Sequence, residues 1–332
     1  MPKLFAGITG IGSAVPAQVM TNDDWAKLID TSDEWIKTRT GISERRIADE
    51  KTASSDLAFE AAQKALASAK VDPKDIELII VATTTPDYPI FPSVAALLQD
   101  RLGCLNAGGF DLSAACSGFA YAFCTASQFI ENGTYKNVLL VGVDTLSKFV
   151  DRTDRNVCVL FGDAAGAVVL QSVKAGYGHL GSILGLRGSG AESLIVKAGG
   201  SRTPLAKENI GTPESYIYMN GKEVFKFAVT MMGEVTEQAI IKAGLTVQDI
   251  DLYIPHQANI RIIDSAMKRL GLPPEKLFVN LDKYGNTSAA SIPLALDEAY
   301  RAGRVKPGQV VAVCGFGAGL TWAANVFRWV LE

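Results

Sequence analysis

The sequence has only two histidines, His179 and His256, in 332 residues. Any reaction that depends on an imidazole must therefore use one of these two side chains. The five cysteines are odd in number and form no C-x-x-C pair, which argues against a disulfide framework and a cysteine zinc site. Free thiols are typical of a reducing compartment, so we expect a cytoplasmic protein.

Long hydrophobic runs are also missing. No apolar run approaches the roughly 18 residues of a membrane span, and glycines interrupt the apolar stretch Ala6–Gly12, which makes it a poor signal peptide. The formal net charge is −3, whereas a nucleic-acid-binding surface is basic. Neither a membrane nor a nucleic acid is an expected partner.

The chain is rich in hydrophobic residues, which make up 48% of it and suffice for a large core in one domain or two fused halves. Short β-rich runs alternate with longer helical patterns, which is the signature of an α/β fold. Helical spacing predicts helices over residues 54–70, with the Ser-Ser-Asp run at its start as candidate caps, and over residues 222–243, ended by Gly244. Three apolar runs fit strands covered on both faces: Leu78–Ala82, Val138–Val141 and Val310–Val313.

The two halves of the chain resemble each other weakly. Asp75–Leu78 is echoed by Asp249–Leu252, an offset of 249 − 75 = 174, and the strand before Gly142 is echoed by the strand before Gly315, an offset of 315 − 142 = 173. Chance produces two such matches as readily as an internal duplication does. A duplication would divide the chain in the glycine-rich stretch near residue 175, into halves spanning 1–175 and 176–332.

Cys116 lies where a strand-like segment runs through a turn into a helical pattern. The positive end of a helix dipole favours a thiolate, which is the nucleophilic form of cysteine, and the small residues around Cys116 leave room for a substrate. The alternative, and the common case, is an inert core cysteine. We interpret the other four cysteines as packing residues: Cys104, Cys124, Cys158 and Cys314.

His256 follows a predicted strand, Leu252–Ile254, and precedes a helical pattern. The carboxyl ends of strands carry the active sites of open α/β folds, so His256 is a candidate catalytic residue. A satisfied loop histidine is the alternative for His256, and it is our interpretation of His179.

Asn286 opens another helical stretch, where an asparagine commonly acts as an N-cap. In a duplicated fold, residue 116 + 171 = 287 would correspond to Cys116, which would place Asn286 and Cys116 at equivalent helix starts facing one cleft. The glycine-rich segment Gly315–Gly319 follows a predicted strand, and such a turn can bring backbone N–H groups close to a ligand.

Three segments around these residues resemble the catalytic motifs of the β-ketoacyl-[acyl-carrier-protein] synthase III family: Asp111-Leu-Ser-Ala-Ala-Cys116-Ser-Gly-Phe, Pro255-His256-Gln-Ala-Asn-Ile-Arg261 and Gly285-Asn286-Thr-Ser-Ala-Ala-Ser. Residues 31–42 and 161–167 are also similar to that family, so the resemblance runs in order along nearly the whole chain. It implies a thiolase-like five-layered αβαβα fold built from two duplicated α/β halves, the first with the nucleophile and the second with the histidine and asparagine. It also implies a homodimer.

The resemblance implies an acyltransferase that starts type II fatty acid synthesis by a decarboxylative condensation. Cys116 would accept the acyl group of a short acyl-CoA, with acetyl-CoA as the expected starter. His256 and Asn286 would donate hydrogen bonds to the thioester carbonyl of malonyl-acyl-carrier protein and stabilise the enolate left by CO₂, without a metal or a cofactor. Related elongating enzymes use Cys-His-His, but no histidine follows His256 here.

Binding residues for both substrates are implied as well. Trp35 and Arg155 would sandwich the adenine of CoA, and Arg39 would bind phosphate. Without the resemblance, Trp35 would be an ordinary buried indole and Arg155 a solvated loop residue. Further contacts with the CoA substrate would come from Thr31, Gly221, Phe225, Ala258, Asn259, Phe316 and Gly317.

Acyl-carrier protein is acidic and is the expected protein partner. The resemblance and the basic residues near it imply a docking site made of Gln257, Ala258, Asn259, Ile260, Arg261, Lys226, Lys268 and Arg269. Residues 257–270 show an amphipathic helix pattern, with the basic residues opposite an apolar stripe. Phe91 would reach the acyl pocket of the other subunit across the dimer.

Two positions depart from the family pattern. Lys222 stands where a well-known branch has an amide at a pantetheine contact, and Ala318 stands where a third glycine is common. Two alternative functions stay open: a specialised condensing enzyme that uses another starter for a secondary product, and a non-catalytic partner that only binds acyl-carrier protein. The presence of Cys116, His256 and Asn286 argues against the second.

Overall fold

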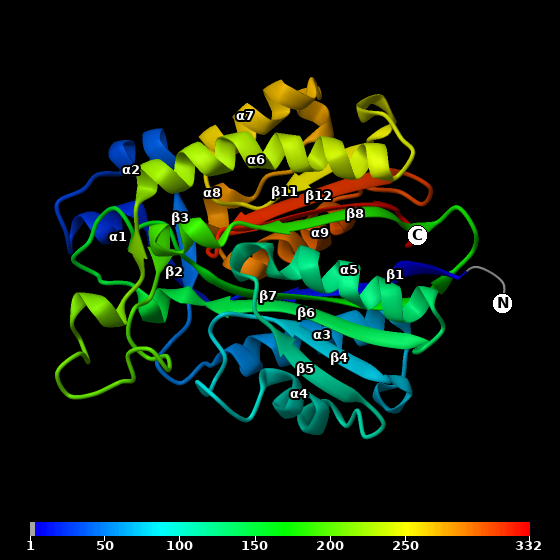
Figure 1. Ribbon diagram of the computed structural model, residues 1–332, viewed down its shortest axis with the longest axis horizontal. Coiled ribbons are helices and arrows are strands. Elements are labelled where there is room, and N and C mark those ends of the chain that lie inside the picture. Colours follow the sequence, from blue (N-terminus) through cyan, green and yellow to red (C-terminus); the bar gives the residue numbers. More distant parts are fainter. Residues whose placement is uncertain (1–3) are drawn as a thin grey trace.

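The computed structural model describes residues 4–332, which form two β-sheets stacked between layers of helices (Figure 1). The larger sheet contains β1 (Phe5–Ala14), β4 (Leu78–Ala82), β5 (Gly108–Leu112), β6 (Asn137–Thr145) and β7 (Asp163–Val173), in the order β1-β7-β6-β4-β5. The smaller sheet contains β8 (Gly178–Leu186), β11 (Leu252–Pro255), β12 (Val310–Gly317) and β13 (Thr321–Arg328), in the order β11-β12-β13-β8.

The main helices form three layers, which together with the two sheets make five (Figure 1). A central layer lies between the sheets and consists of α5 (Gly118–Glu131) and α9 (Ser291–Arg301). The outer face of the larger sheet is covered by α3 (Ser54–Ala69) and α4 (Val94–Leu102), and that of the smaller sheet by α6 (Gly221–Lys242) and α7 (Ile260–Leu270).

Helices on both faces explain why β4, β6 and β12 are buried along nearly their whole length, because these strands lie inside the sheets and both of their faces are covered. Along β4, Ile80 packs in the central cluster with Phe123 of α5, while Ile79 points the other way and packs with Leu98 of α4. All four side chains are buried. Because side chains alternate along a strand, β4 contributes residues to two separate apolar clusters, one on each face of the sheet.

One end of the layered body carries a small substructure (Figure 1). It packs around an apolar cluster that includes Trp25, Ile36 and Phe161. The backbone oxygen of Arg39 accepts a hydrogen bond from Asn259 Nδ2 at 2.9 Å, which ties this end to the start of α7. Its elements are β2 (Gln18–Thr21), β3 (Glu44–Ile47), α1 (Asn22–Ala26), α2 (Asp33–Thr40), β9 (Leu194–Ile195), β10 (Tyr218–Met219) and α8 (Leu281–Tyr284).

The two sheets share one pattern of strand directions, which confirms the predicted duplicated α/β fold. In the larger sheet β1–β7 and β7–β6 are antiparallel and β6–β4 is parallel. In the smaller sheet β8–β13 and β13–β12 are antiparallel and β12–β11 is parallel. The first set of strands lies within residues 5–173 and the second within 178–328, which supports a division near residue 175 as a proposal.

The turns before the two central helices also correspond. Ala115 and Ser288 both have a left-handed backbone, with φ values of 48° and 51°, and they lie 288 − 115 = 173 residues apart. A Cβ added to Gly142 would collide with the backbone of Ala289, and one added to Gly315 would press on the backbone of Cys116. Cys116 therefore corresponds to Ala289, at the offset of 173 found in the sequence echoes, and not to residue 287 at an offset of 171.

Several predicted boundaries need small corrections. The helix predicted at 54–70 is α3, but its N-cap is Ala53, whose N–H donates to the Asp56 carboxylate at 2.8 Å. The helix predicted at 222–243 is α6, and Gly244 follows it with a left-handed φ of 72°. Among residues 4–332, no helix has the length and apolar composition needed to cross a membrane.

Candidate active site

Cys116 lies in a 3₁₀ turn, Ala115–Ser117, that leads directly into the central helix α5. This is the predicted position at a helix start. The side chain is buried, with 7% of its surface exposed. The end of β12 packs against it, and a Cβ on Gly317 would lie 2.6 Å from the Cys116 nitrogen. Glycine is therefore required at residue 317, because any side chain there would collide with the turn that holds the thiol.

Burial works against the thiolate that the helix start favours at Cys116. It raises the pKa of Cys116 to about 12 and the nearby Asp144 adds to the rise, while a hydrogen bond from the Ser288 side chain opposes it. A thiol with this pKa would lose its proton during the reaction itself.

His256 lies at the carboxyl end of β11, as predicted from the strand before it. Its backbone N–H donates to Cys314 O at 2.7 Å, which continues the pairing of β11 with β12. Its ring is 1% exposed, lies edge-on to Phe316 at 5.4 Å between centroids, and has Nδ1 2.5 Å from Ser291 Oγ. Burial lowers the pKa of His256 to about 3, so the ring is neutral at pH 7.

Asn286 is not a helix cap, because α9 begins only at Ser291. Backbone bonds hold it against the segment before β7: Asn286 N donates to Leu160 O at 2.8 Å, and Gly162 N donates to Asn286 O at 3.1 Å. Its side-chain Oδ1 accepts from Ser288 N at 2.9 Å. With the oxygen occupied, the amide NH₂ is the group left to donate to a ligand.

Ser288 connects these residues, and the sequence did not reveal it. It is buried, it fixes the Asn286 oxygen through its backbone, and its hydroxyl bonds the Cys116 thiol. The left-handed φ of a non-glycine residue costs free energy, and such strain is typical of functional sites. The structure thus brings the turns of Cys116 and Asn286 together from the two halves of the chain, with His256 beside the same end of β12.

The predicted CoA residues gather at the end of the molecule where α2 meets α7. The guanidinium groups of Arg39 and Arg155 lie 4.6 Å and 5.2 Å from the centroid of the Trp35 ring. Arg155 also bonds Asp30, with distances of 2.8 Å to its backbone oxygen and 3.1 Å to its carboxylate. A base between Trp35 and Arg155 needs two contacts of about 3.5 Å, so Arg155 must move outward to form the predicted sandwich.

The Thr31 hydroxyl, in the same region, is buried and has no hydrogen-bond partner among residues 4–332. An unpaired buried hydroxyl costs free energy, so a ligand that bonds it would gain from its position. Arg261, at the start of α7, lies over the ring of Phe225 in α6, with 5.2 Å between the guanidinium carbon and the ring centroid. Asn259 is the N-cap of α7, and its Oδ1 accepts from Arg261 N at 3.0 Å. Its Nδ2 donates to Arg39 O, so both ends of the side-chain amide already have partners.

The remaining predicted contact residues differ in exposure. Gly221 begins α6 and is exposed, Ala258 is half-buried, and Phe316 is buried beside His256. Gln257 is buried, with Nε2 donating to Pro255 O at 2.7 Å and Oε1 accepting from Asn280 N at 3.1 Å. A side chain enclosed in this way does not reach a protein surface, which corrects the placement of Gln257 in the docking site.

The predicted docking helix begins at Ile260, three residues later than the sequence pattern suggested. Its apolar stripe is buried against α6, and Arg261, Lys268 and Arg269 are exposed. Arg269 pairs with Glu237 at 3.3 Å and packs its stem on Gly233, whereas Lys268 makes no ion pair among residues 4–332. Lys268 is therefore free to meet an acidic partner, and so is Arg261, which makes no ion pair among residues 4–332 either.

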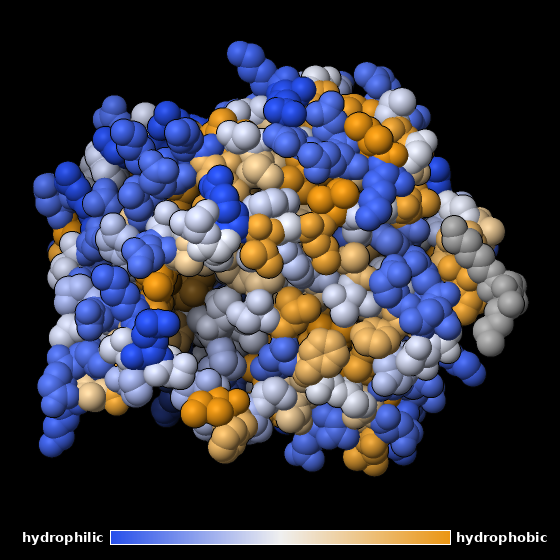
Figure 2. All heavy atoms as spheres, in the orientation of Figure 1, coloured by the Kyte–Doolittle hydropathy of each residue, from blue (hydrophilic) through white to orange (hydrophobic). Residues whose placement is uncertain are grey.

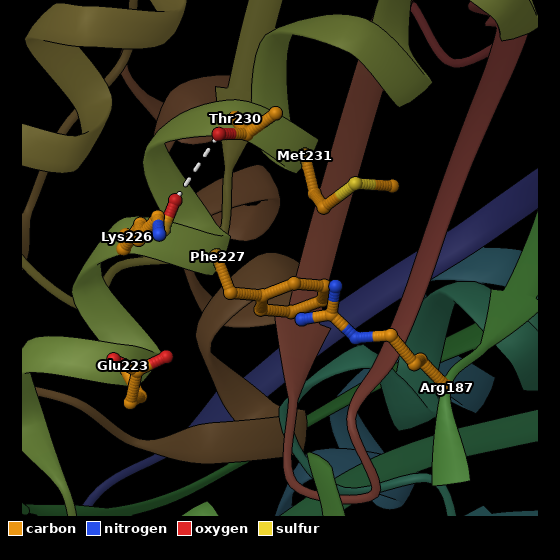
Figure 3. Close-up of a pocket in the computed structure, with 6 residues that line it drawn as sticks. All are labelled: Arg187, Glu223, Lys226, Phe227, Thr230 and Met231. Carbon is orange, nitrogen blue, oxygen red and sulfur yellow. Dashed lines mark hydrogen bonds between the residues drawn. The ribbon is translucent and has the colours of Figure 1, made fainter. Parts of the chain in front are cut away.

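Lys226 lines a cavity of about 180 Å³ between α6 and the segment that follows β8 (Figure 3). The Arg187 guanidinium lies over the Phe227 ring at 5.1 Å, and Thr230 Oγ1 donates to Lys226 O at 3.1 Å (Figure 3). Glu223 adds a carboxylate to the lining, so the cavity is not purely basic. Sequence patterns did not predict this cavity, because β8 and α6 are far apart in the chain.

His179 is a structural residue, as interpreted, although it lies in β8 and not in a loop. Its ring bonds Glu131 at 2.8 Å and Ser182 at 2.6 Å. The other cysteines are free and mostly buried among apolar side chains. Among residues 4–332, no group of three or more histidine, cysteine or acidic residues is arranged to hold a metal ion.

An apolar band crosses the face on which β8, α5 and β5 lie, and a hollow opens beside it (Figure 2). Exposed apolar side chains of these elements include Leu184, Leu186 and Phe110. The loop before α4 adds Ile90 and Phe91, which are 82% and 78% exposed. Phe91 is thus exposed on its own chain, and its predicted role at the acyl pocket of a second subunit stays a prediction.

Comparison with known proteins agrees with the geometry. Residues 110–202 match the family described as 3-oxoacyl-[acyl-carrier-protein] synthase III, and residues 240–329 match its C-terminal part. β-Ketoacyl-[acyl-carrier-protein] synthase III of Symbiobacterium thermophilum is 58% identical over 97% of this chain and 98% of its own. The enzyme of that name from Caldanaerobacter subterraneus subsp. tengcongensis is 55% identical over 98% of both.

Solved structures give the same result. The synthase III of Thermus thermophilus superposes with a TM-score of 0.92 at 49% identity, over 98% of this chain and 100% of its own. The priming β-ketosynthase of the R1128 polyketide pathway has a TM-score of 0.91 at 37% identity, over 99% and 97%. These relatives confirm the thiolase-like fold and the condensing acyltransferase activity. The chain belongs to the β-ketoacyl-[acyl-carrier-protein] synthase III family.

Proposed function

We propose that the reaction begins when the sulfur of Cys116 attacks the thioester carbonyl of a short acyl-CoA. A bond forms between this sulfur and the carbonyl carbon, the bond from that carbon to the CoA sulfur breaks, and the thiol proton leaves on CoA. The backbone N–H of Cys116 and the turn Gly315–Gly319 would hold the oxyanion. A concerted loss of the proton fits a thiol whose pKa is raised by burial to about 12.

The second half of the proposed reaction uses the His–Asn pair. The thioester carbonyl of malonyl-acyl-carrier protein would accept hydrogen bonds from His256 Nε2 and Asn286 Nδ2. As CO₂ leaves, the electrons of the broken C–C bond form an enolate. The enolate carbon bonds the acyl carbonyl carbon, the bond from that carbon to the Cys116 sulfur breaks, and the sulfur takes up a proton from water as β-ketoacyl-acyl-carrier protein is released. These two donors stabilise the developing negative charge, so no metal or cofactor enters the proposal.

The observation that carries this proposal is the orientation of the two donors. Asn286 has its oxygen tied to Ser288 N, and His256 has Nδ1 tied to Ser291, so both present their other nitrogen. The low pKa of His256 keeps its ring neutral, and a neutral ring can donate while an adjacent carbonyl becomes an enolate. A general base in the same place would instead need a ring that gains a proton.

Acyl-CoA and malonyl-acyl-carrier protein would both reach Cys116 through the end of the molecule formed by α2, α6 and α7. Trp35, Arg39 and Arg155 would bind the nucleotide of CoA, with Arg155 moving outward to admit adenine. The unpaired hydroxyl of Thr31 supports this location. The free cysteines agree with a cytoplasmic enzyme, which we retain as the proposed location.

A homodimer is part of the proposal. β5 is an edge strand, its first three residues are exposed, and an open edge pairs readily with another strand. The apolar band beside it would be covered by the second copy (Figure 2). In such a dimer the exposed Phe91 of one subunit would close the acyl pocket of the other.

A panel of starters tests this assignment. With malonyl-acyl-carrier protein, purified enzyme should condense acetyl-CoA faster than butyryl-, isobutyryl- or octanoyl-CoA, because surplus methylenes in a closed pocket cost roughly 10–200-fold in rate each. Phe91→Ala should raise the octanoyl rate relative to the acetyl rate, measured by mass spectrometry of the product. An unchanged ratio would show that Phe91 does not limit the pocket.

Synthesis of a secondary product is the second candidate, and the likeness to the R1128 priming ketosynthase favours keeping it. The same panel separates the two. A preference for a longer or branched starter in the unmodified enzyme would support the specialised role, since the chemistry at Cys116 is the same in both.

Docking of acyl-carrier protein is proposed for the exposed face of α7. Lys268→Glu should raise the KM for malonyl-acyl-carrier protein several-fold and weaken its salt dependence, because the lysine is exposed and makes no ion pair within residues 4–332. Lys64→Glu makes the same charge change on α3, in the outer layer on the opposite side of the molecule, and should not do so. Steady-state kinetics at low and high salt measure both. Equal KM values for the two variants would place the docking face elsewhere.

A further inference from the structure

Ser291 contacts the catalytic histidine from behind. Its Oγ lies 2.5 Å from His256 Nδ1, and each residue is 1% exposed. Ser291 is the first residue of α9, so the rigid central helix carries the hydroxyl. The serine is the hydrogen-bond partner of the imidazole on the side away from the proposed substrate position.

The hydrogen bonds of Ser291 decide which ring nitrogen carries the proton. Its Oγ also accepts the backbone N–H of Gln257 at 3.4 Å. No acceptor other than His256 Nδ1 lies within reach of the hydroxyl hydrogen among residues 4–332. If Nδ1 carried the proton, the serine hydrogen would be buried without a partner, which costs free energy. The hydroxyl therefore donates to Nδ1, and the ring hydrogen is on Nε2.

We propose that Ser291 is a positioning residue that holds His256 as the Nε2–H tautomer, the form that can donate to the malonyl thioester carbonyl. The proposal rests on the role of His256 in the proposed function. The tautomer matters because the opposite one would present a lone pair to the carbonyl oxygen, and two lone pairs repel. The hydroxyl thus acts on the reaction only through the imidazole.

Other contacts restrain the ring but do not select the tautomer. The His256 backbone is fixed by its bond to Cys314 O at 2.7 Å, and the edge-on Phe316 ring limits rotation of the imidazole. The side-chain amide of Gln257 is hydrogen-bonded through both its nitrogen and its oxygen. These bonds fix the position of the residue, and with it the backbone N–H that donates to Ser291 Oγ. Within the described part of the chain, only the serine hydroxyl bonds a nitrogen of the ring, so removing it should free the proton to move between the two nitrogens.

Nitrogen-15 NMR of labelled histidine reads the tautomer directly, and the presence of only two histidines makes assignment simple. His256 in the unmodified enzyme should show a protonated Nε2 and an unprotonated Nδ1. Ser291→Ala should give a mixture of both tautomers, and Ser291→Thr, which keeps the hydroxyl, should restore the single form. His179→Gln assigns the other ring.

Kinetics supply the second readout. Ser291→Ala should slow decarboxylation of malonyl-acyl-carrier protein about 10-fold, the usual effect of one lost hydrogen bond, and should change acyl transfer to Cys116 far less. Ser127→Ala is the matched control, because Ser127 is a buried serine of α5 whose hydroxyl has no hydrogen-bond partner among residues 4–332. It should alter neither the tautomer nor the rates.

A protonated Nδ1 in the unmodified enzyme would overturn the proposal, and so would a Ser291→Ala variant that keeps both the single tautomer and the decarboxylation rate. If the unmodified enzyme neither acylates Cys116 nor decarboxylates malonyl-acyl-carrier protein, the proposed function fails instead. The NMR measurement distinguishes the two failures, because it reports the tautomer without any turnover.

Discussion

Cys116→Ser is expected to lower the condensation rate by at least roughly 10³-fold, because it removes the nucleophile of the covalent route. A serine hydroxyl has no equivalent of the thiolate near neutral pH. In the unmodified enzyme, acetyl-CoA alone should add one acetyl group, and peptide mapping after intact-mass measurement should place it on Cys116. Acetylation of Cys124 or Cys158 instead would show that the nucleophile has been misassigned.

The pH dependence of the reaction of Cys116 with iodoacetamide tests whether burial raises the pKa of its thiol. Because the pKa is raised to about 12, the thiolate fraction is small at pH 7 and rises about tenfold per pH unit up to pH 10. The alkylation rate should follow this rise without levelling off. A plateau near pH 7 would mean that the thiolate is the resting form. Cys124→Ser is the control, since Cys124 is the least buried of the other cysteines.

His256→Ala and Asn286→Ala should each slow decarboxylation of malonyl-acyl-carrier protein by roughly 10²–10³-fold, as the loss of one oxyanion donor usually does. Acyl transfer from acetyl-CoA to Cys116 should be retained to a greater extent, because both side chains are assigned to the malonyl carbonyl. Release of CO₂ and formation of acyl-enzyme, measured separately, resolve the two half-reactions.

His179→Ala is the matched control for the histidine, since its ring bonds only Glu131 and Ser182 within the described residues. It should leave both half-reactions near their normal rates. A His256→Ala or Asn286→Ala variant that decarboxylates normally would remove that residue from the oxyanion site. A variant that loses acyl transfer and decarboxylation equally would indicate a role in both steps.

The sequence by itself determined the class of fold and the identity of the family. Apolar runs such as Leu78–Ala82 fit strands covered on both sides, and helical spacing located α3 and α6 to within a residue or two. The residues around Cys116, His256 and Asn286 were specific enough to predict three motifs of one family. These inferences succeed because they depend on neighbours in the chain and on the period of the side chains.

Only the tertiary structure decided the burial, the hydrogen bonds and the pKa values of those residues. The pKa of Cys116 depends on how much water the surrounding layers exclude, and that burial comes from segments as distant as Gly317 and Ser288. The tie between Ser291 and His256 spans 35 residues of sequence. Gln257 was predicted to share a docking surface with Arg261 and Lys268, which are exposed, but packing turned its side chain inward. Burial and hydrogen bonding between remote segments have no local pattern, because they arise only when two α/β halves pack against each other.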